Sequence, residues 1–289
     1  MSNMVVRTNV LAINSHRSLK QVGTQQAKSS ARLSSGYKVN SAADDAAGLA
    51  ISEKMRAQIR GLDQASTNAQ DSISLIQTAE GGMQEIDNMI QRIRELTVKA
   101  ANDTLEGSNP GTAPSDRVKV QDEIKQLITE IDKMAGRVEF NKKKVINGSF
   151  SITSGKPLHF QVGANAGQSM TLHIESVDSG TLGIRGEFDA MHTADGATIS
   201  NLLTKVDDAL EKVTTERSKL GAAQNRLEYT MKSLDISSEN LSASESRIRD
   251  TDMAKEMMSL TQANVLQQAA TSMLAQANQA PQSVLQLLQ

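Results

Sequence analysis

The stretch that decides the fold is residues 62–96, LDQASTNAQDSISLIQTAEGGMQEIDNMIQRIREL. Its apolar residues recur in steps of three or four, the spacing of one stripe on an α-helix. The stripe consists of Leu62, Ala65, Ala69, Ile73, Ile76, Ala79, Met83, Ile86, Ile90, Ile93 and Leu96. Upstream, Ser41-Ala-Ala-Asp44 has the pattern of a capping box in which the serine accepts a backbone N–H. We therefore expect a helix over about residues 42–101, roughly 90 Å long at 1.5 Å per residue, and hence a rod.

A second helical stripe follows a turn. Glycine and proline residues between 107 and 114 interrupt the helical pattern and indicate a change of direction. The stripe then resumes in steps of four and three over Val120, Ile124, Leu127, Ile131, Met134 and Val138. We expect this second helix to pack antiparallel on the first.

The period then changes to alternation in two short runs separated by the Gly/Asn-rich residues 163–169. The apolar members of these runs are Leu158, Phe160, Val162, Met170, Leu172 and Ile174. Alternation predicts a β-hairpin with one apolar face against the helices. If Phe160 pairs with Leu172, His159 faces His173 across the strands.

From residue 199 the helical period returns as a sustained heptad. Every seventh residue is apolar, namely Val206, Val213, Leu220, Leu227, Leu234, Leu241 and Ile248. A heptad kept over this length predicts a helix packed along a partner throughout. The second core position of the heptad lies three residues before each of these and is not uniformly apolar. It contains Leu203, Leu210 and Met231 but also Arg217, Gln224, Ser238 and Glu245. Because a two-stranded homodimer would need both core positions apolar, we expect a small bundle instead.

Composition favours elongated helices and excludes several classes of protein. Aromatic residues make up 2% of the chain, and only four prolines interrupt it. Cysteine is absent, which excludes disulfides and thiolate metal ligands. A net charge of −2 is too balanced to indicate a nucleic-acid partner. The N-terminal stretch lacks the apolar core of a cleaved signal peptide, and polar residues break up the uncharged C-terminal stretch, so it is not expected to span a membrane.

The two ends of the chain differ sharply in charge. Residues 1–43 contain six basic side chains and no acidic one, and residues 257–289 contain no charged side chain. Ordering such polar segments costs about 1–2 kcal/mol per residue in backbone entropy, which only burial can offset. We therefore expect both ends to be loose in the monomer and to order on assembly. Adaptable side chains suited to such a contact are Met253, Met257, Met258 and Met273.

Motifs at both ends resemble those of bacterial flagellins. The N-terminal motifs are RLSSG at 32–36, VNSAADDAAGLAI at 39–51, GLDQASTNAQD at 61–71 and QRIREL at 91–96. The C-terminal motifs are NRL at 225–227, NLSASESRIRD at 240–250, MLAQAN at 273–278 and VLQLL at 284–288. The hairpin motif FQVG at 160–163 is similar as well, so the resemblance covers nearly the whole chain.

The resemblance implies a mainly α fold: a long antiparallel helical rod or coiled coil, a small β-hairpin, and terminal helices that pair as a coiled coil. It implies an extracellular subunit of the bacterial flagellar filament, exported by the flagellar type III system for motility. The implied partners are other copies of the chain, an export chaperone, filament cap and junction proteins, and an animal Toll-like receptor. Neither nucleic acid nor membrane insertion is expected.

The implied domain division runs along the chain in five segments. An N-terminal inner helix at 1–40 precedes the N-terminal part of the rod at 41–183. A short linker at 184–198 replaces the variable outer region, so the chain resembles a minimal flagellin. The C-terminal rod helix at 199–250 leads into the C-terminal inner helix at 251–289.

Three sets of candidate residues follow. The expected polymerisation contacts are Val10, Ile13, Leu33, Asp44, Asp45, Leu266, Met273, Leu274, Leu285 and Leu288. The expected rod core comprises Ile73, Ile76, Ile86, Ile93, Leu127, Leu220, Leu227, Leu234 and Leu241. By resemblance, the positions that would contact a Toll-like receptor are Arg92, Leu96 and Glu123, with Leu96 as an apolar anchor.

The sequence gives little support for an enzymatic function. The Asp44-Asp45 pair has no third ligand nearby and suits a helix N-terminus and a subunit contact. No His-Glu-x-x-His motif or phosphate loop occurs, so we expect no enzyme activity, cofactor or metal. The alternatives are a hook–filament junction protein, which shares similar ends, an intracellular coiled-coil scaffold, and, more remotely, a secreted enzyme.

Overall fold

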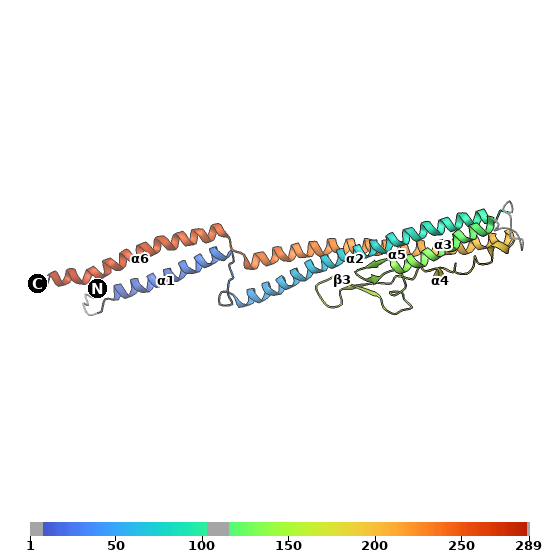
Figure 1. The fold of residues 1–289 in the computed structure, drawn as a ribbon. Helices are drawn as coiled ribbons and strands as arrows, with labels where there is room; N and C mark the ends of the chain where they lie inside the picture. The colour runs from blue at the N-terminus through green and yellow to red at the C-terminus, as the bar shows by residue number, and fades with distance from the viewer. Residues whose placement is uncertain (1–7, 103–115, 288–289) are drawn as a thin grey trace. The chain divides into compact units, whose positions relative to one another are not determined.

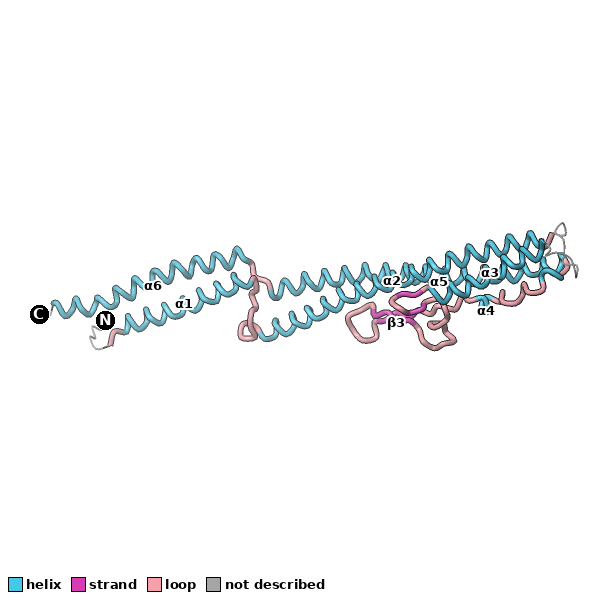
Figure 2. The backbone as a smooth tube through the Cα atoms, in the orientation of Figure 1, coloured by secondary structure: helices cyan, strands magenta, loops and turns pink. Residues whose placement is uncertain are grey.

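The computed structural model describes residues 8–102 and 116–287, with side chains described up to residue 279. The chain divides into two compact units, residues 1–59 with 239–289 (unit 1) and residues 60–238 (unit 2). Helices dominate, and the named strands among the described residues form two short antiparallel pairs (Figures 1 and 2). The mainly α fold with a small β-hairpin, expected from the sequence, is confirmed.

Unit 2 is built on three long helices that lie side by side in Figure 1. These are α3 (Asp116–Arg137) and the unit-2 parts of α2 (Ala46–Ala100) and α5 (Gly196–Arg249). Polar contacts show that α2 and α5 are antiparallel. Arg94 Nε donates to Asp207 Oδ1 at 2.7 Å, and Ser66 Oγ donates to Asp235 Oδ1 at 2.9 Å, so the residue numbers run in opposite directions.

The apolar stripes of these helices meet in one core. The α2 stripe and the α5 heptad supply side chains that are at most 1% exposed, among them Ile76, Met83, Ile86, Ile90, Ile93, Val206, Val213, Leu220 and Leu227. From α3, Ile124 and Ile131 complete the core at 0% exposure. Burial of each such side chain stabilises the fold by about 1.5–3 kcal/mol, which allows aliphatic residues to replace the missing aromatic ones.

A β-hairpin lies against the helices of unit 2. Strand β3 (Leu158–Gln161) pairs with β4 (Ser169–Leu172), and the expected apolar face is buried. The expected register was wrong by two residues: Phe160 pairs with Met170, and His159 faces Thr171 rather than His173. The reason is a shorter turn, in which the Val162 N–H donates to the Gln168 carbonyl at 3.1 Å. A smaller pair joins β1 (Glu139–Phe140) to β2 (Lys143–Lys144).

The segment expected to be a linker is packed into the core. It follows α4 (Ser179–Leu182) and contains a 3-10 turn, η1 (Met191–Thr193). Ile184 is 0% exposed, and Phe188 and Met191 are each 1% exposed. Gln121 on α3 fixes the segment by donating from Nε2 to the carbonyls of Phe188 and Asp189 at 2.7 and 2.6 Å.

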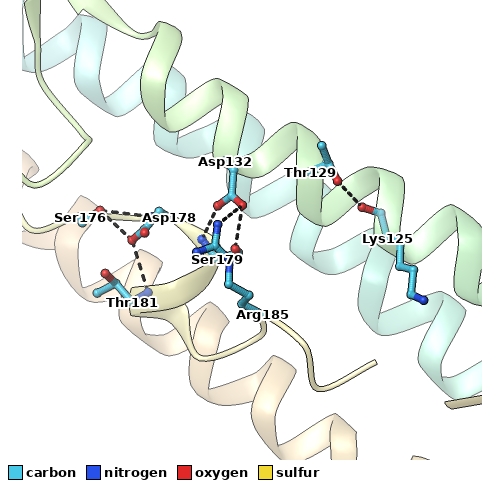
Figure 3. Close-up of polar contacts among 8 residues, drawn as sticks. All are labelled: Lys125, Thr129, Asp132, Ser176, Asp178, Ser179, Thr181 and Arg185. Carbon is cyan, nitrogen blue, oxygen red and sulfur yellow. Dashed lines mark hydrogen bonds and ion pairs between the residues drawn. The ribbon is translucent and has the colours of Figure 1, made fainter. Parts of the chain in front are cut away.

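Two aspartates hold the turn around α4 (Figure 3). Asp178 is the N-cap, and its carboxylate accepts hydrogen bonds from the Thr181 N–H at 3.3 Å and the Ser176 hydroxyl at 2.8 Å. Burial raises the pKa of Asp178, but these hydrogen bonds together outweigh it, so the pKa lies below its ordinary value. Asp132 on α3 accepts from the Ser179 N–H, the Ser179 hydroxyl and the Arg185 guanidinium at 2.8, 2.9 and 3.1 Å.

Unit 1 contains the terminal helices α1 (Val10–Ser35) and α6 (Met253–Leu287), with the adjoining parts of α2 and α5. Gly36 caps the C-terminal end of α1, and its φ of +74° suits glycine. The Gly36 N–H donates to the Arg32 carbonyl. The Lys38 N–H donates to the Arg249 carbonyl at 2.7 Å, and the Thr251 N–H donates to the Gly36 carbonyl at 3.0 Å. These bonds join the end of α1 to the end of α5. Unit 1 also includes residues 41–59 and 239–250, which the sequence assigned to the rod.

The N-terminus of α2 differs from the expected one. Helix α2 begins at Ala46, and the cap is Asp45, whose carboxylate accepts from the Gly48 N–H at 2.9 Å. The expected capping role of Ser41 is therefore wrong. Its hydroxyl instead donates to Asp44 Oδ2 at 3.2 Å, so Ser41 and Asp44 close a tight turn just before the helix.

Candidate subunit-contact surface

The two terminal helices form an antiparallel pair within unit 1. Asn9 Nδ2 donates to the Ala277 carbonyl at 2.7 Å, and Gln26 Nε2 donates to Asn264 Oδ1 at 2.7 Å. Arg32 lies 3.8 Å from Glu256 near the other end of the pair. Residue numbers rise along α1 as they fall along α6, which fixes the register of the pair.

The seam between α1 and α6 is thin. The buried side chains on these helices, among those described, are small: Ser29, Ala263 and Ala277, at 4%, 3% and 9% exposure. The larger apolar side chains on the same helices, including Leu33, Leu260 and Leu274, are only half-buried. The pair therefore gains only part of the hydrophobic stabilisation that full burial of these side chains would give.

Larger apolar side chains of these helices point into solvent. Of the fourteen exposed large apolar residues among those described, ten belong to unit 1. They are Val10, Leu11, Ile13, Ile51, Met253, Met257, Met258, Val265, Leu266 and Met273. Solvent-exposed apolar residues gathered in one region mark an interaction surface.

A shallow groove runs along one side of α6. Its lining consists of Met257, Met258, Thr261, Gln262, Val265 and Leu266. Met258 is 67% exposed and Val265 is 60% exposed. No charged side chain lines this groove. An apolar partner could cover it without removing a charge from water.

The predicted polymerisation residues fall into three groups. Val10, Ile13, Leu266 and Met273 are exposed, whereas Leu33 and Leu274 are half-buried. The side chain of Leu285 and all of Leu288 lie outside the described residues. Leu11 and Val265 are equally exposed but were not among the predicted residues, although both lie in stretches poor in charge.

Asp44 and Asp45 have local partners. Lys28 Nζ lies 2.7 Å from Asp44 Oδ1, and this hydrogen bond lowers the pKa of Asp44 to about 2. Burial opposes the shift, and hydrogen bonds from the Ser41 hydroxyl and backbone N–H add to it. Asp45 caps α2, as described above. Both aspartates therefore organise the turn between α1 and α2.

The residues expected in the rod core differ in burial. Ile76, Ile86, Ile93, Leu220 and Leu227 are at most 1% exposed, and Leu234 is 8% exposed. Ile73 and Leu127 are partly buried and pack against the core. Leu241 is half-buried and belongs to unit 1 rather than to the core of unit 2.

The three residues that the resemblance assigns to receptor contact do not all lie on the surface of the protein. Arg92 and Glu123 are exposed, and the guanidinium donates to Glu123 Oε1 at 3.0 and 3.1 Å and to Glu95 at 3.0 Å. Leu96 is only 2% exposed within the core of unit 2. The apolar-anchor role expected for Leu96 does not fit this burial, because a partner cannot reach the side chain.

The described residues contain neither a candidate metal site nor a candidate membrane span. Within residues 8–102 and 116–287, no group of three or more His, Asp or Glu side chains could hold a metal ion. Over the same residues, none of the helices has the length and apolarity needed to cross a bilayer. Helical units with an exposed apolar surface define the class of a structural, self-associating protein.

Comparison with known proteins identifies the family. The model of the bacterial flagellin N-terminal helical region matches residues 6–151, and the C-terminal counterpart matches residues 203–288. The chain is 45% identical to the flagellin of Bacillus subtilis and 47% identical to that of Halalkalibacterium halodurans, each over 99% of this chain and 100% of the relative. A putative flagellar hook-associated protein from Vibrio parahaemolyticus shares the fold over 72% of this chain and 100% of its own, with a TM-score of 0.56 and 12% identity.

The chain belongs to the bacterial flagellin family. It is a structural subunit of the flagellar filament that assembles with copies of itself, and it is not an enzyme.

Proposed function

We propose that unit 1 is the main polymerisation element of this filament subunit, and that the filament lies outside the cell. The observation that carries the proposal is the concentration of exposed large apolar residues in unit 1, where the fully buried side chains of α1 and α6 are small. Each such side chain gains about 1.5–3 kcal/mol when a neighbouring copy covers it.

The charge pattern supports the same proposal. Beyond Glu256 the chain carries no charged residue, so a neighbour that covers α6 removes no charge from water. On the facing helix, Lys28 and Arg32 are basic but are paired with Asp44 and Glu256. The part of α6 beyond Glu256 can therefore enter a close-packed interface at little electrostatic cost.

The terminal helices are further proposed to gain most of their order on assembly. Their small mutual seam offsets little of the conformational entropy that folding removes. Loose ends would also suit passage through the type III export channel and binding by an export chaperone. Cap and junction proteins would then meet the same surface at the ends of the filament.

Receptor recognition is a second proposal, limited to two of the three positions. Arg92 and Glu123 are exposed and adjacent, so a Toll-like receptor could contact their joined side chains. Because Leu96 is buried, any apolar contribution would come from other residues.

Charge substitutions on α6 test the polymerisation proposal. Met258→Asp and Val265→Asp place a carboxylate on the groove, where burial without a partner costs several kcal/mol. We expect the critical concentration for polymerisation to rise at least about 100-fold, which corresponds to about 2.7 kcal/mol. Because both positions are exposed in the monomer, its circular dichroism should stay unchanged.

Met258→Leu and Val265→Ile are the matched controls, because they keep the positions apolar. These variants should polymerise within a few-fold of the unmodified chain. Normal filament growth by both aspartate variants would overturn the proposal.

A further inference from the structure

Unit 2 carries an exposed basic hairpin tip. Asn141 and Lys142, which join β1 to β2, have φ values of +48° and +63°, where non-glycine residues are uncommon. Lys142, Lys143 and Lys144 are exposed, and none of their ammonium groups makes a hydrogen bond or ion pair among the described residues. Glu139 is the cross-strand partner of Lys144, so three lysines and one glutamate leave the hairpin with a formal charge of +2.

A cleft of about 450 Å³ in the same unit has the opposite charge. It lies between α5 and the segment around α4, and its lining includes the buried Val177 and Leu182. Four carboxylates and one ammonium line it, which gives a formal charge of −3. These are Glu175, Asp208, Glu211, Glu216 and Lys212.

The charges in the cleft that remain unpaired are negative. Lys212 Nζ donates to the Thr181 and Leu182 carbonyls at 3.0 and 3.2 Å, and Glu216 is paired with Lys219. By contrast, Asp208 and Glu211 are exposed, and their carboxylates have no hydrogen-bond or ion-pair partner within the described part of the chain. Two free carboxylates therefore face solvent at this cleft.

One wall of the cleft is held in place before any partner arrives. Asp178 and Asp132 fix the turn around α4 through the hydrogen bonds drawn in Figure 3. Their carboxylates are already engaged, so they do not compete for a partner. A wall that needs no reordering lowers the entropy cost of binding.

We propose that the basic hairpin of one copy docks at the acidic cleft of a neighbouring copy, with Lys142 and Lys143 facing Asp208 and Glu211. The occupant is a second copy because the two surfaces have complementary charge and form no ion pair with each other within one described chain. Two different patches make a heterologous contact, which does not close on itself and so suits an open filament. The inference rests on polymerisation of the chain and adds a unit-2 contact to the one proposed for unit 1.

Cysteine cross-linking tests this contact, since the chain contains no cysteine. A Lys143→Cys, Glu211→Cys double variant is assembled, oxidised and run on a denaturing non-reducing gel. We expect a ladder of multimers, because each copy offers both halves of the contact. The control pair is Lys143→Cys with Asp71→Cys, which replaces an exposed acidic residue on α2 outside the cleft. Filaments in which the test pair yields no more multimers than the control would overturn the proposal without affecting polymerisation itself.

Charge reversal provides a second, independent readout. Lys142→Glu with Lys143→Glu, or Asp208→Lys with Glu211→Lys, should each raise the critical concentration at least about tenfold, because like charges then meet. Combining all four substitutions in one chain should restore assembly to within a few-fold. A quadruple variant no better than the two double variants would overturn the proposal, and so would double variants that assemble normally. Failure of the unmodified chain to form filaments would instead count against its polymerisation.

Discussion

The ammonium of Lys28 lies 2.7 Å from Oδ1 of Asp44, which ties α1 to the turn that precedes α2. The pair lowers the pKa of Asp44 to about 2, whereas an aspartate in an unfolded chain titrates near about 3.9. A folded-state pKa below the unfolded one stabilises the fold above the unfolded value. This contribution is therefore complete above about pH 4 and is lost as the pH falls toward about 2.

Substitution of Lys28 should reveal this coupling. In Lys28→Met the midpoint of the Asp44 carboxyl titration should rise toward about 3.9, because the main hydrogen bond to the carboxylate is gone. Carbon-detected nuclear magnetic resonance of the Asp44 side chain measures the midpoint directly. A midpoint that is the same in both proteins would show that Lys28 does not hold the carboxylate.

The heptad of α5 predicts a contrast between two residues two positions apart. Leu227 is 0% exposed and Tyr229 is 73% exposed. Leu227→Ala should lower the free energy of unfolding by about 2–5 kcal/mol, because it removes buried methyl groups and leaves a cavity. Tyr229→Ala should change it by no more than about 0.5 kcal/mol. Urea unfolding followed by circular dichroism gives both values, and equal effects would mean that the packed face of α5 is misassigned.

Two adjacent glycines on α2 provide a matched pair. A Cβ at Gly82 would lie 2.7 Å from Cγ2 of Val138, whereas a Cβ at Gly81 would meet nothing within 4 Å. Val138 is β-branched and yields little, so Gly82→Ala should destabilise the fold by about 1–3 kcal/mol. Gly81→Ala should instead stabilise it by about 0.5–1 kcal/mol, since alanine favours a helix interior. Thermal unfolding of both variants checks the opposite signs; a stabilised Gly82→Ala would refute the close packing of α2 on Val138.

The long-range features of the fold follow from apolar periodicity. The heptad residues Val206, Val213, Leu220 and Leu227 were recognisable because burial requires one apolar side chain on the same face in every two turns. The alternation that predicts the hairpin also identified its buried face, including Phe160 and Met170. In both cases a repeated pattern carries the signal over many residues.

Short-range features were less predictable. The hairpin register goes with a short turn, closed by bonds such as that from the Val162 N–H to the Gln168 carbonyl, that no apolar pattern specifies. The cap of α2 is Asp45 rather than Ser41, because neighbouring polar residues compete for the same backbone N–H groups. The packed segment before α5 did have a signal, since Ile184, Phe188 and Met191 are spaced by four and three.

The Arg92–Glu123 pair allows receptor contact to be separated from stability. Both side chains are about half exposed, and exposed ion pairs contribute little. Arg92→Ala should therefore change the free energy of unfolding by less than about 1 kcal/mol. If Arg92→Ala is as stable as the unmodified chain but no longer elicits the receptor response, then Arg92 contacts the receptor. A large destabilisation would instead assign Arg92 a structural role.

The central claim is that copies of the chain bury the exposed apolar side chains of unit 1 against one another. A helical reconstruction of the assembled filament at side-chain resolution tests it most directly. We predict that Val10, Met258, Val265 and Met273, exposed in the single chain, lose nearly all their solvent exposure to neighbouring copies. Filaments in which these four side chains stay as exposed as in the monomer, with all contacts between copies made by unit 2, would contradict the claim.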